Sequence, residues 1–402
     1  MRRHFLALVA LVGVGTGGAA DALEIRFQPA DRVYVYENRG EGTPADLFSA
    51  VIQNLAFVND AERPVTLRGA RLEVLRDGRV VAAQQIEDEE LAGHARTMHA
   101  YQQQGVLDAY DFQFQTSRYL KGVELAPSTT LAAGQGLVVS RRALLLVGLA
   151  DAIRVVAEGK TEDGAAVTAE GGLTVVLHQS LNRYRLPVDG RWIAAAGPSL
   201  HGHHRWSSIQ EFAFDLVRIG EGGLTHRGAG QRLADYYAYG EPVRVMEQGV
   251  VVAVLDGVEE SDGDLQQSGE SDEAFFQRTL EAQQRRLAKG FPYAMGNHVV
   301  IEHADGEHSH YAHLQTGSIA VAAGDRVARG EQIGRLGHSG NSTEPHLHVH
   351  LTDGPDVAHS RSLPLAFDEV RLFPGGVPVR HLHSGQILES VAPLSAAPAA
   401  SP

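Results

Sequence analysis

Three histidines alternate with apolar residues toward the C-terminal end of this sequence. Residues 345–351 read PHLHVHL. Side chains two residues apart on a β-strand point the same way, so His346, His348 and His350 share one face, and the apolar residues share the other. The apolar face fixes the register of the strand, while neutral imidazoles are good ligands for a metal. We interpret this strand as the floor of a zinc site. The alternative is a polar strand face on which the histidines bind nothing.

An aspartate lies in an otherwise apolar strand earlier in the chain. Residues 211–217 read EFAFDLV, and the aromatic and aliphatic side chains that alternate there share the buried face, which leaves Asp215 on the opposite one. A carboxylate that is buried without a partner is strongly destabilising. We therefore expect Asp215 either to bind a metal or to form an ion pair, for which Arg205 and Arg218 are the candidate cations.

Further histidines lie close to these strands in the sequence. A loop at residues 201–206 reads HGHHRW and leads into the strand of the aspartate. Residues 309–314 read SHYAHL, and the two-residue period of a strand predicts that His313 shares a face with Tyr311. The histidines thus gather in the C-terminal half of the chain.

Four short motifs in this half, taken in order, resemble those of the lysostaphin/LytM-type zinc metallopeptidases. They are YAHL at 311–314, GDxVxxGxxIG at 324–334, GxSGNST at 337–343 and HLH at 346–348. The resemblance covers roughly residues 196 to 355 and leaves the earlier part of the chain outside it.

The resemblance implies which residues form the site. In this family a histidine and an aspartate from an early segment hold the metal, together with the second histidine of the His-x-His strand. It therefore implies His204, Asp215 and His348 as the ligands of a zinc ion. It also implies that His313 and His346 are unligated catalytic histidines.

Two departures from the family pattern are visible. The first histidine and the aspartate are commonly separated by three residues, whereas His204 and Asp215 lie farther apart. His203 and His201 are therefore alternative first ligands. We favour His204 because it is nearest in sequence to the aspartate, and because adjacent side chains of an extended backbone diverge. The second departure is His350, where the family often has a glutamate.

The resemblance also implies a function. It predicts a secreted zinc metallo-endopeptidase that cleaves peptide bonds of bacterial peptidoglycan, in a cross-bridge or a stem peptide, through a metal-activated water. One alternative is a catalytically degenerate LytM-like regulator or binding module of cell-wall hydrolases. A periplasmic copper-binding or cupin-like protein is another. A lipoyl or biotinyl carrier domain would need a lysine on a hairpin, and residues 299–351 contain none.

Composition and the N-terminus narrow these classes. The chain of 402 residues has no cysteine, which excludes disulfides, thiolate zinc ligands and a cysteine nucleophile. A net charge of -14 argues against nucleic acid as a partner. A charged start, an apolar run at residues 5–12 and Ala20-Asp21-Ala22 predict a cleaved signal peptide over 1–22, and hence a periplasmic or secreted protein. No later segment predicts a transmembrane span.

The whole chain is predicted to be mainly β. Short alternating segments with turn signals predict an accessory β-sandwich over residues 23–195, interrupted by a helical excursion from Asp88 to about Leu120. Residues 196–375 form the LytM-type peptidase domain, which by resemblance is antiparallel β and similar to a duplicated hybrid motif. A helical insertion follows Ser271 in this domain. Residues 376–402 form a tail rich in Pro, Ala and Ser.

Overall fold

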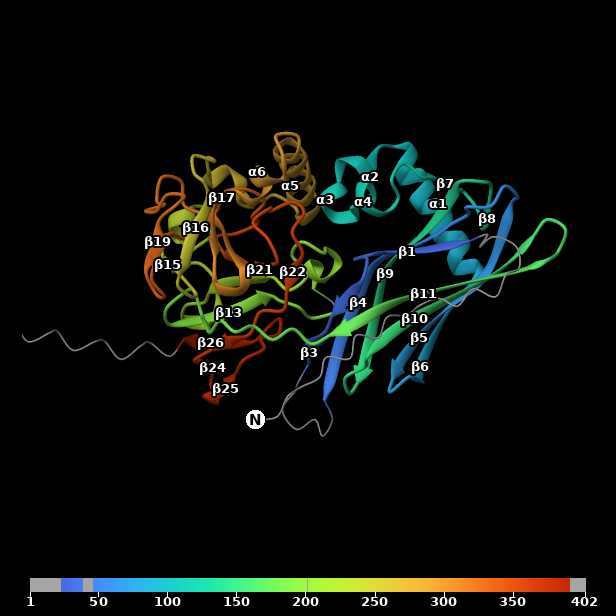
Figure 1. The fold of residues 1–402 in the computed structure, drawn as a ribbon. Coiled ribbons are helices and arrows are strands. Elements are labelled where there is room, and N and C mark those ends of the chain that lie inside the picture. Colours follow the sequence, from blue (N-terminus) through green and yellow to red (C-terminus); the bar gives the residue numbers. More distant parts are fainter. Residues whose placement is uncertain (1–22, 39–45, 201, 391–402) are drawn as a thin grey trace, which may run out of the picture.

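The computed structural model describes residues 23–38, 46–200 and 202–390. The predicted signal peptide over 1–22 and the last part of the predicted tail lie outside these ranges. Within them the protein is mainly β, as predicted, with two β-rich halves side by side (Figure 1). No helix in the described ranges is both long and apolar enough to cross a membrane.

The N-terminal half consists of two facing sheets. The first has the order β1-β4-β9-β7, with β3 beside β4; the second has the order β2-β11-β10-β5-β6, with β8 beside β5. Their bounds are β1 (Glu24–Gln28), β2 (Arg32–Tyr34), β3 (Tyr36–Glu37), β4 (Leu47–Val58), β5 (Val65–Arg76), β6 (Arg79–Glu87), β7 (Glu124–Leu125), β8 (Thr130–Leu131), β9 (Gln135–Val147), β10 (Ala152–Thr161) and β11 (Ala166–Val176). Alternate side chains from both sheets, such as Ile52, Leu67 and Val155, fill one core between them.

Four helices interrupt this sandwich where the sequence predicts a helical excursion. They are α1 (Asp88–Gln103), α2 (Val106–Ala109), α3 (Asp111–Phe114) and α4 (Thr116–Tyr119). The first turn of α1 is acidic, which suits the positive end of the helix dipole. Met98, Leu107 and Phe114 pack with Val138 on the outer face of the first sheet. The helices therefore cover that face and extend toward the second half of the molecule (Figure 1).

The C-terminal half is built on one long antiparallel sheet. Its order is β19-β16-β17-β18-β21-β14-β13-β26-β24-β25, with β22 beside β21. Two small sheets, β12-β23 and β15-β20, complete this half. The bounds are β12 (Tyr184–Arg185), β13 (Arg191–Ala196), β14 (Phe214–Arg218), β15 (Pro242–Arg244), β16 (Gly249–Leu255), β17 (Asn297–Glu302), β18 (His308–Leu314), β19 (Arg326–Val327), β20 (Gln332–Arg335), β21 (Leu347–Thr352), β22 (Ser362–Leu363), β23 (Phe367–Asp368), β24 (Val370–Leu372), β25 (Val377–Val379) and β26 (Ile387–Ser390).

The ends of this half differ from the predicted boundaries. β13 spans Arg191–Ala196 and pairs with β14, so the C-terminal sheet includes residues before 196. β26 lies within the predicted tail but pairs with both β13 and β24. The sheet thus continues past residue 375 to Ser390, because the apolar side chain of Leu388 packs into the core of this half.

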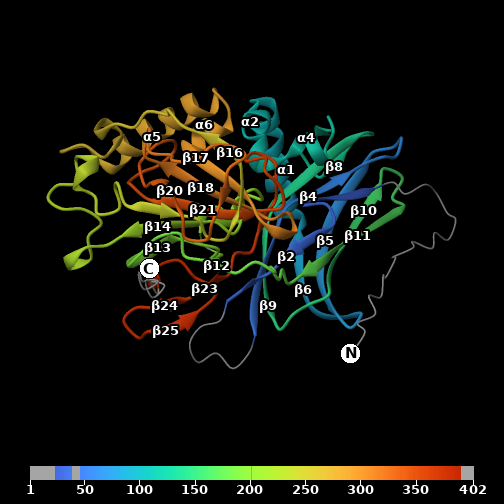
Figure 2. The same cartoon turned by 60° about the vertical axis from the view of Figure 1, so that its left-hand side comes forward.

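The predicted helical insertion lies between β16 and β17. It consists of α5 (Asp272–Leu287) and α6 (Phe291–Met295). The hydroxyl of Ser271 accepts a hydrogen bond from the backbone N–H of Ala274 and so caps α5. Figures 1 and 2 both show α5 and α6 on the same side of the molecule as the helices of the sandwich.

A buried carboxylate ties the linker between the halves to the C-terminal sheet. Glu307, just before β18, accepts hydrogen bonds from Nε2 of His178 at 2.8 Å and from the Tyr184 hydroxyl at 2.6 Å. Ser180 and Asn182 donate to it as well. Burial alone would raise its pKa, but these hydrogen bonds outweigh that effect and lower the pKa of Glu307 to about 2.

The lowered pKa of Glu307 makes the free energy of unfolding depend on pH. Because the pKa of Glu307 falls from 4.5 to about 2 on folding, its contribution is fully present above pH 4.5 and is lost as the pH falls toward 2. The shift corresponds to about 3 kcal/mol. We expect Glu307→Gln to lower the free energy of urea unfolding at pH 7, with a much smaller difference from wild type at pH 3. Glu302→Gln, at an exposed position of β17, is the control. Equal losses at both pH values would contradict this account.

Candidate active site

Asp215 joins two of the predicted site histidines. β14 pairs with β21 so that Asp215 lies directly opposite His348. One carboxylate oxygen, Oδ1, lies 2.9 Å from Nδ1 of His348. The other, Oδ2, lies 2.8 Å from Nε2 of His204. The early loop and the distant strand β21 therefore meet at this one carboxylate.

Neither of the candidate cations pairs with this aspartate. Arg205 forms an ion pair with Glu211, and Arg218 forms one with Glu241. Burial of the Asp215 carboxyl would raise its pKa, but the imidazoles of the site hold that pKa well below its usual value. The group is therefore ionised at neutral pH and has its two oxygens directed at histidines.

The structure places both adjacent histidines of the early loop near the aspartate. They open a 3₁₀ helix, His203–Trp206. His204 is buried, whereas the side chain of His203 is 70% exposed and its Nε2 lies 3.6 Å from Oδ2 of Asp215. His203, His204 and Asp215 offer possible ligand atoms within 4.8 Å of one another. His201 lies outside the described residues.

A buried ion pair holds this 3₁₀ helix against the sandwich. The fully buried guanidinium of Arg205 pairs with Glu211, and its Nη2 donates to the carbonyl oxygen of Ser49 at 2.9 Å. In return, Nε2 of Gln53 donates to the carbonyl oxygen of Arg205 at 3.0 Å. Ser49 and Gln53 both lie on β4. The accessory half therefore positions the segment that carries His204.

Glu211 also explains the unusual spacing of this site. It stands four residues before Asp215, where the family pattern commonly has its first histidine. Here that position carries the carboxylate that neutralises Arg205. The imidazole that approaches Asp215 comes instead from His204, farther back along the chain.

The other two predicted site histidines face the same space. The rings of His313 and His346 lie 4.7 Å apart, and His313 lies 5.9 Å from His348. Nδ1 of His313 is 2.7 Å from the carbonyl oxygen of Ser339, and Nδ1 of His346 is 2.8 Å from that of Glu344. Because a carbonyl only accepts, each Nδ1 carries the proton and each Nε2 has a free lone pair.

The predicted orientation of His313 is wrong. Strict alternation would place it on the buried face with Tyr311, which lies in the core. Instead His313 has a φ of 62°, a left-handed conformation that is rare for a residue with a side chain. That conformation interrupts the alternation and brings the ring to the face of His346 and His348. Such strain is typical of functional positions.

His350 supports His348 from behind. Its Nδ1 lies 3.1 Å from Nε2 of His348, and its ring stacks on that of His310 at 4.5 Å. Burial keeps the pKa of His350 well below its usual value, so this ring is neutral at pH 7. Because the ionised carboxylate of Asp215 only accepts, Nδ1 of His348 donates to it, and Nε2 of His348 accepts from Nδ1 of His350.

A cavity of about 300 Å³ opens over these side chains. Several of its lining residues were not predicted from the sequence: Phe112, Phe291, Met295, Asn341 and Thr343. Phe112 belongs to α3 of the accessory half, and its ring lies 4.6 Å from that of Phe291 in α6. No local sequence signal identifies Phe112, because only the packing of the two halves brings it to the site.

A family comparison agrees with this arrangement. Residues 284–358 match the model of Peptidase family M23. The chain carries an M23 peptidase domain. The matched range contains His313, His346 and His348. His204 and Asp215 precede this range in the sequence, and the fold brings them close to these histidines.

Curated relatives match a limited part of the chain. Peptidoglycan DD-endopeptidase ShyA of Vibrio cholerae is 39% identical over 82 residues, which are 20% of this chain and 18% of ShyA. DD-carboxypeptidase/endopeptidase Mpg of Neisseria meningitidis is 47% identical over 60 residues, 15% of this chain and 13% of Mpg. Cell division protein DipM of Caulobacter vibrioides is 39% identical over 62 residues, which are 15% of this chain and 10% of DipM. The match thus spans less than a fifth of each relative.

Solved structures give weaker likenesses. The catalytic domain of lysostaphin from Staphylococcus simulans is 16% identical, with a TM-score of 0.23 over 46% of this chain and 86% of that one. A zinc-containing peptidase from Vibrio cholerae is 15% identical, with a TM-score of 0.23 over 83% of this chain and 85% of that one. Scores of this size assign nothing to the present chain.

The buried pair beneath the M23 site gives a testable prediction. Glu211→Leu leaves the Arg205 guanidinium buried without its carboxylate, so we expect a loss of about 3–5 kcal/mol in the free energy of urea unfolding. Replacing both partners, Arg205→Met with Glu211→Leu, should recover part of that loss. Glu241→Gln, which breaks the half-exposed pair with Arg218, should cost less than about 1 kcal/mol. Equal effects of the two single variants would refute this role for Glu211.

Proposed function

We propose that this protein is an exported zinc metallo-endopeptidase that hydrolyses peptide bonds of bacterial peptidoglycan. The observation that carries the proposal is the buried carboxylate of Asp215, with imidazole nitrogens of His204 and His348 at hydrogen-bond distance from its two oxygens. The M23 domain match supports the peptidase class.

The residues present fit a zinc ion. Two imidazoles and one carboxylate are a donor set typical of catalytic zinc, and they leave a coordination position for water or substrate. Burial lowers the pKa of His348, which keeps that ring neutral and its lone pair available. His204, Asp215 and His348 would hold the metal. His203 is the less suitable ligand because its ring is largely exposed.

Bound zinc would supply a Lewis acid that polarises the scissile carbonyl and acidifies the attacking water. The chain's own contribution comes from His313 and His346. Their Nδ1 protons are held by carbonyl oxygens, so each Nε2 is free to accept the proton of the water and later return one to the leaving amine. Phe112 and Phe291 line the same cavity as these rings.

The proposed substrate rests on the relatives. ShyA is named a peptidoglycan DD-endopeptidase and Mpg a DD-carboxypeptidase/endopeptidase. Export rests on residues 1–22, whose pattern predicts a cleaved signal peptide and would direct the protein to the periplasm or outside the cell. N-terminal sequencing of the mature protein tests this; a chain that retains Met1 would contradict export.

A regulatory or binding role is the second candidate. The observation that favours it is the departure from the family pattern at Glu211, together with the similarity to cell division protein DipM. A module of that kind would bind cell-wall peptides or hydrolases without turnover. Stoichiometric zinc together with release of peptide fragments from purified peptidoglycan would exclude this candidate.

The proposal assigns different roles to two histidines of one strand. His348→Ala and Asp215→Ala should each remove bound zinc and activity, because a site with three protein ligands rarely survives the loss of one. His346→Ala should retain zinc and lower kcat by about 10²–10⁴-fold, because it removes a proton acceptor and no ligand. Zinc is measured on the purified proteins and turnover on isolated peptidoglycan. Full zinc occupancy in His348→Ala would disprove the ligand assignment.

The early loop allows a matched pair of variants. His204→Ala should abolish stoichiometric zinc binding, whereas His203→Ala should retain it, since only His204 is buried against Asp215. The two substitutions remove the same side chain at neighbouring positions, so each is the control for the other. The reverse result would make His203 the ligand and leave the enzyme class intact. Retention of zinc by both would place the early ligand elsewhere.

A further inference from the structure

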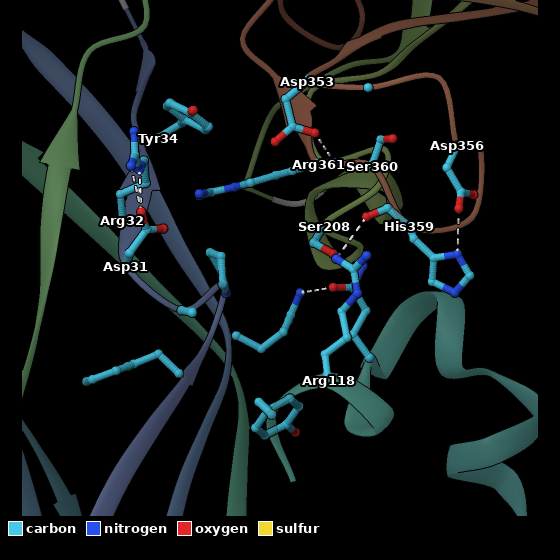
Figure 3. A pocket seen from close by; sticks show the side chains of 17 residues that line it. Asp31, Arg32, Tyr34, Arg118, Ser208, Asp353, Asp356, His359, Ser360 and Arg361 are labelled. Atoms are coloured by element: carbon cyan, nitrogen blue, oxygen red, sulfur yellow. Dashed lines mark hydrogen bonds and ion pairs between the residues drawn. The ribbon is translucent and has the colours of Figure 1, made fainter. Parts of the chain in front are cut away.

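A second, larger cavity lies between the accessory half and the peptidase half. Its volume is about 610 Å³ (Figure 3), and it shares no lining residue with the cavity over the histidines. The walls come from the β1–β2 turn and β2 of the sandwich, from α4, and from the loop that follows β21. The charged residues among its lining are Asp31, Arg32, Arg118, Asp353, Asp356 and Arg361.

The guanidinium of Arg361 is the unusual feature of this cavity. It extends from the peptidase half toward the sandwich and lies over the ring of Tyr34, 4.3 Å from its centre (Figure 3). Its Nε and Nη2 atoms are buried and have no hydrogen-bond partner among the described residues. Burial lowers the pKa of Arg361, yet an arginine stays protonated at neutral pH.

The neighbouring carboxylates, Glu211, Asp31 and Asp353, form no hydrogen bond with these donors; Glu211 is paired with Arg205. Oδ2 of Asp31 accepts from Nε and Nη2 of Arg32, at 2.8 and 2.6 Å. Oδ1 of Asp353 accepts from the backbone N–H of Arg361 itself, at 2.8 Å. Charged donors that are buried without an acceptor are costly, so an acceptor from outside the chain, whether water or a ligand, would stabilise them.

Other groups in the cavity add donors of the same kind. Nη1 of Arg118 donates to the carbonyl oxygen of His359 at 3.1 Å, which leaves the rest of that guanidinium available. The hydroxyl of Ser208 is buried without a partner among the described residues. A planar anion with two oxygens matches the fork of an arginine, and a carboxylate is the smallest group of that shape.

The charges of the cavity favour a zwitterionic ligand over a polyanion. Asp31, Asp353 and Asp356 line it together with the arginines. These carboxylates would repel a ligand with several phosphates, but they can accept from an ammonium group. A peptide that carries both free carboxylates and a free amine, as the stem peptides of peptidoglycan do, fits this set of groups.

We propose that this cavity is a second binding site for stem peptides, in which Arg361 takes a free carboxylate; the choice of peptide rests on the proposed function. The site would hold a part of the substrate that is not cut. It also adjoins the segment of His204, because the backbone N–H of Ser362, next to Arg361, donates to the carbonyl oxygen of Ser208 at 2.8 Å.

The test compares two probes on the full chain. One is a free stem tetrapeptide, and the other is the same peptide with all its carboxyl groups converted to carboxamides. Binding is measured by isothermal titration calorimetry, and chromatography confirms that the peptide stays intact. We expect the wild-type protein to bind the free peptide at least about tenfold more tightly than the amide, since a hydrogen-bonded charge pair is at stake.

Variants then locate the site. Arg361→Gln should abolish the preference for the free peptide, and Arg361→Lys should retain part of it, because lysine keeps the charge and loses the fork. Arg63→Gln is the control: Arg63 is exposed, pairs with Asp163 and does not line the cavity. If Arg361→Gln fails to fold, as judged by circular dichroism, Arg118→Gln replaces it and should weaken binding of the free peptide severalfold.

Each outcome decides the question. Equal binding of both probes by the wild type, or an unchanged preference in the arginine variants, overturns the proposal. So does binding that is lost in His348→Ala but kept in Arg361→Gln, because the peptide would then lie in the histidine site. A carboxylate preference that depends on Arg361, in a protein without zinc or turnover, would support the cavity and reject the proposed enzyme. Turnover of peptidoglycan without a preference for the free peptide would support the proposed enzyme and reject the second binding site.

Discussion

The arrangement of the C-terminal half depends on one buried carboxylate. Asp215 sits on a strand whose other face is fixed in the core, so its position cannot shift without loss of register. An ionised carboxylate in that place needs partners, and imidazoles from two other segments approach it on both oxygens. The imidazoles that stabilise this carboxylate in the fold also form, together with it, a set of donor atoms suited to a metal.

The accessory half takes part in this assembly rather than only adjoining it. Through Arg205, Ser49 and Gln53 it fixes the segment of His204, and through Phe112 it provides a wall of the cavity. A site that in the family pattern lies within one short segment is here divided between segments held by two cores. A buried ion pair such as Arg205 and Glu211 contributes little net stability when intact but is costly to break. Its main effect is therefore to fix the position of the His204 segment, and its contribution to the free energy of unfolding is small.

Much of this could be predicted from the sequence where local periodicity carries the information. The alternation around His348 and around Asp215 gave the correct faces, and the cap at Ser271 gave the correct start of α5. His313 was placed on the wrong face because a two-residue period cannot detect a positive φ. Phe112 could not be found at all, since its role depends on contact between helices of different halves.

Anomalous diffraction at the zinc edge can locate a zinc ion held by His204, Asp215 and His348. In crystals of the full chain grown with equimolar zinc, we expect one anomalous peak. It should lie about 2.0–2.2 Å from a nitrogen of each of these histidines and from a carboxylate oxygen of Asp215. A peak bound through His203 in place of His204, or the absence of any peak at this carboxylate, would contradict this ligand assignment.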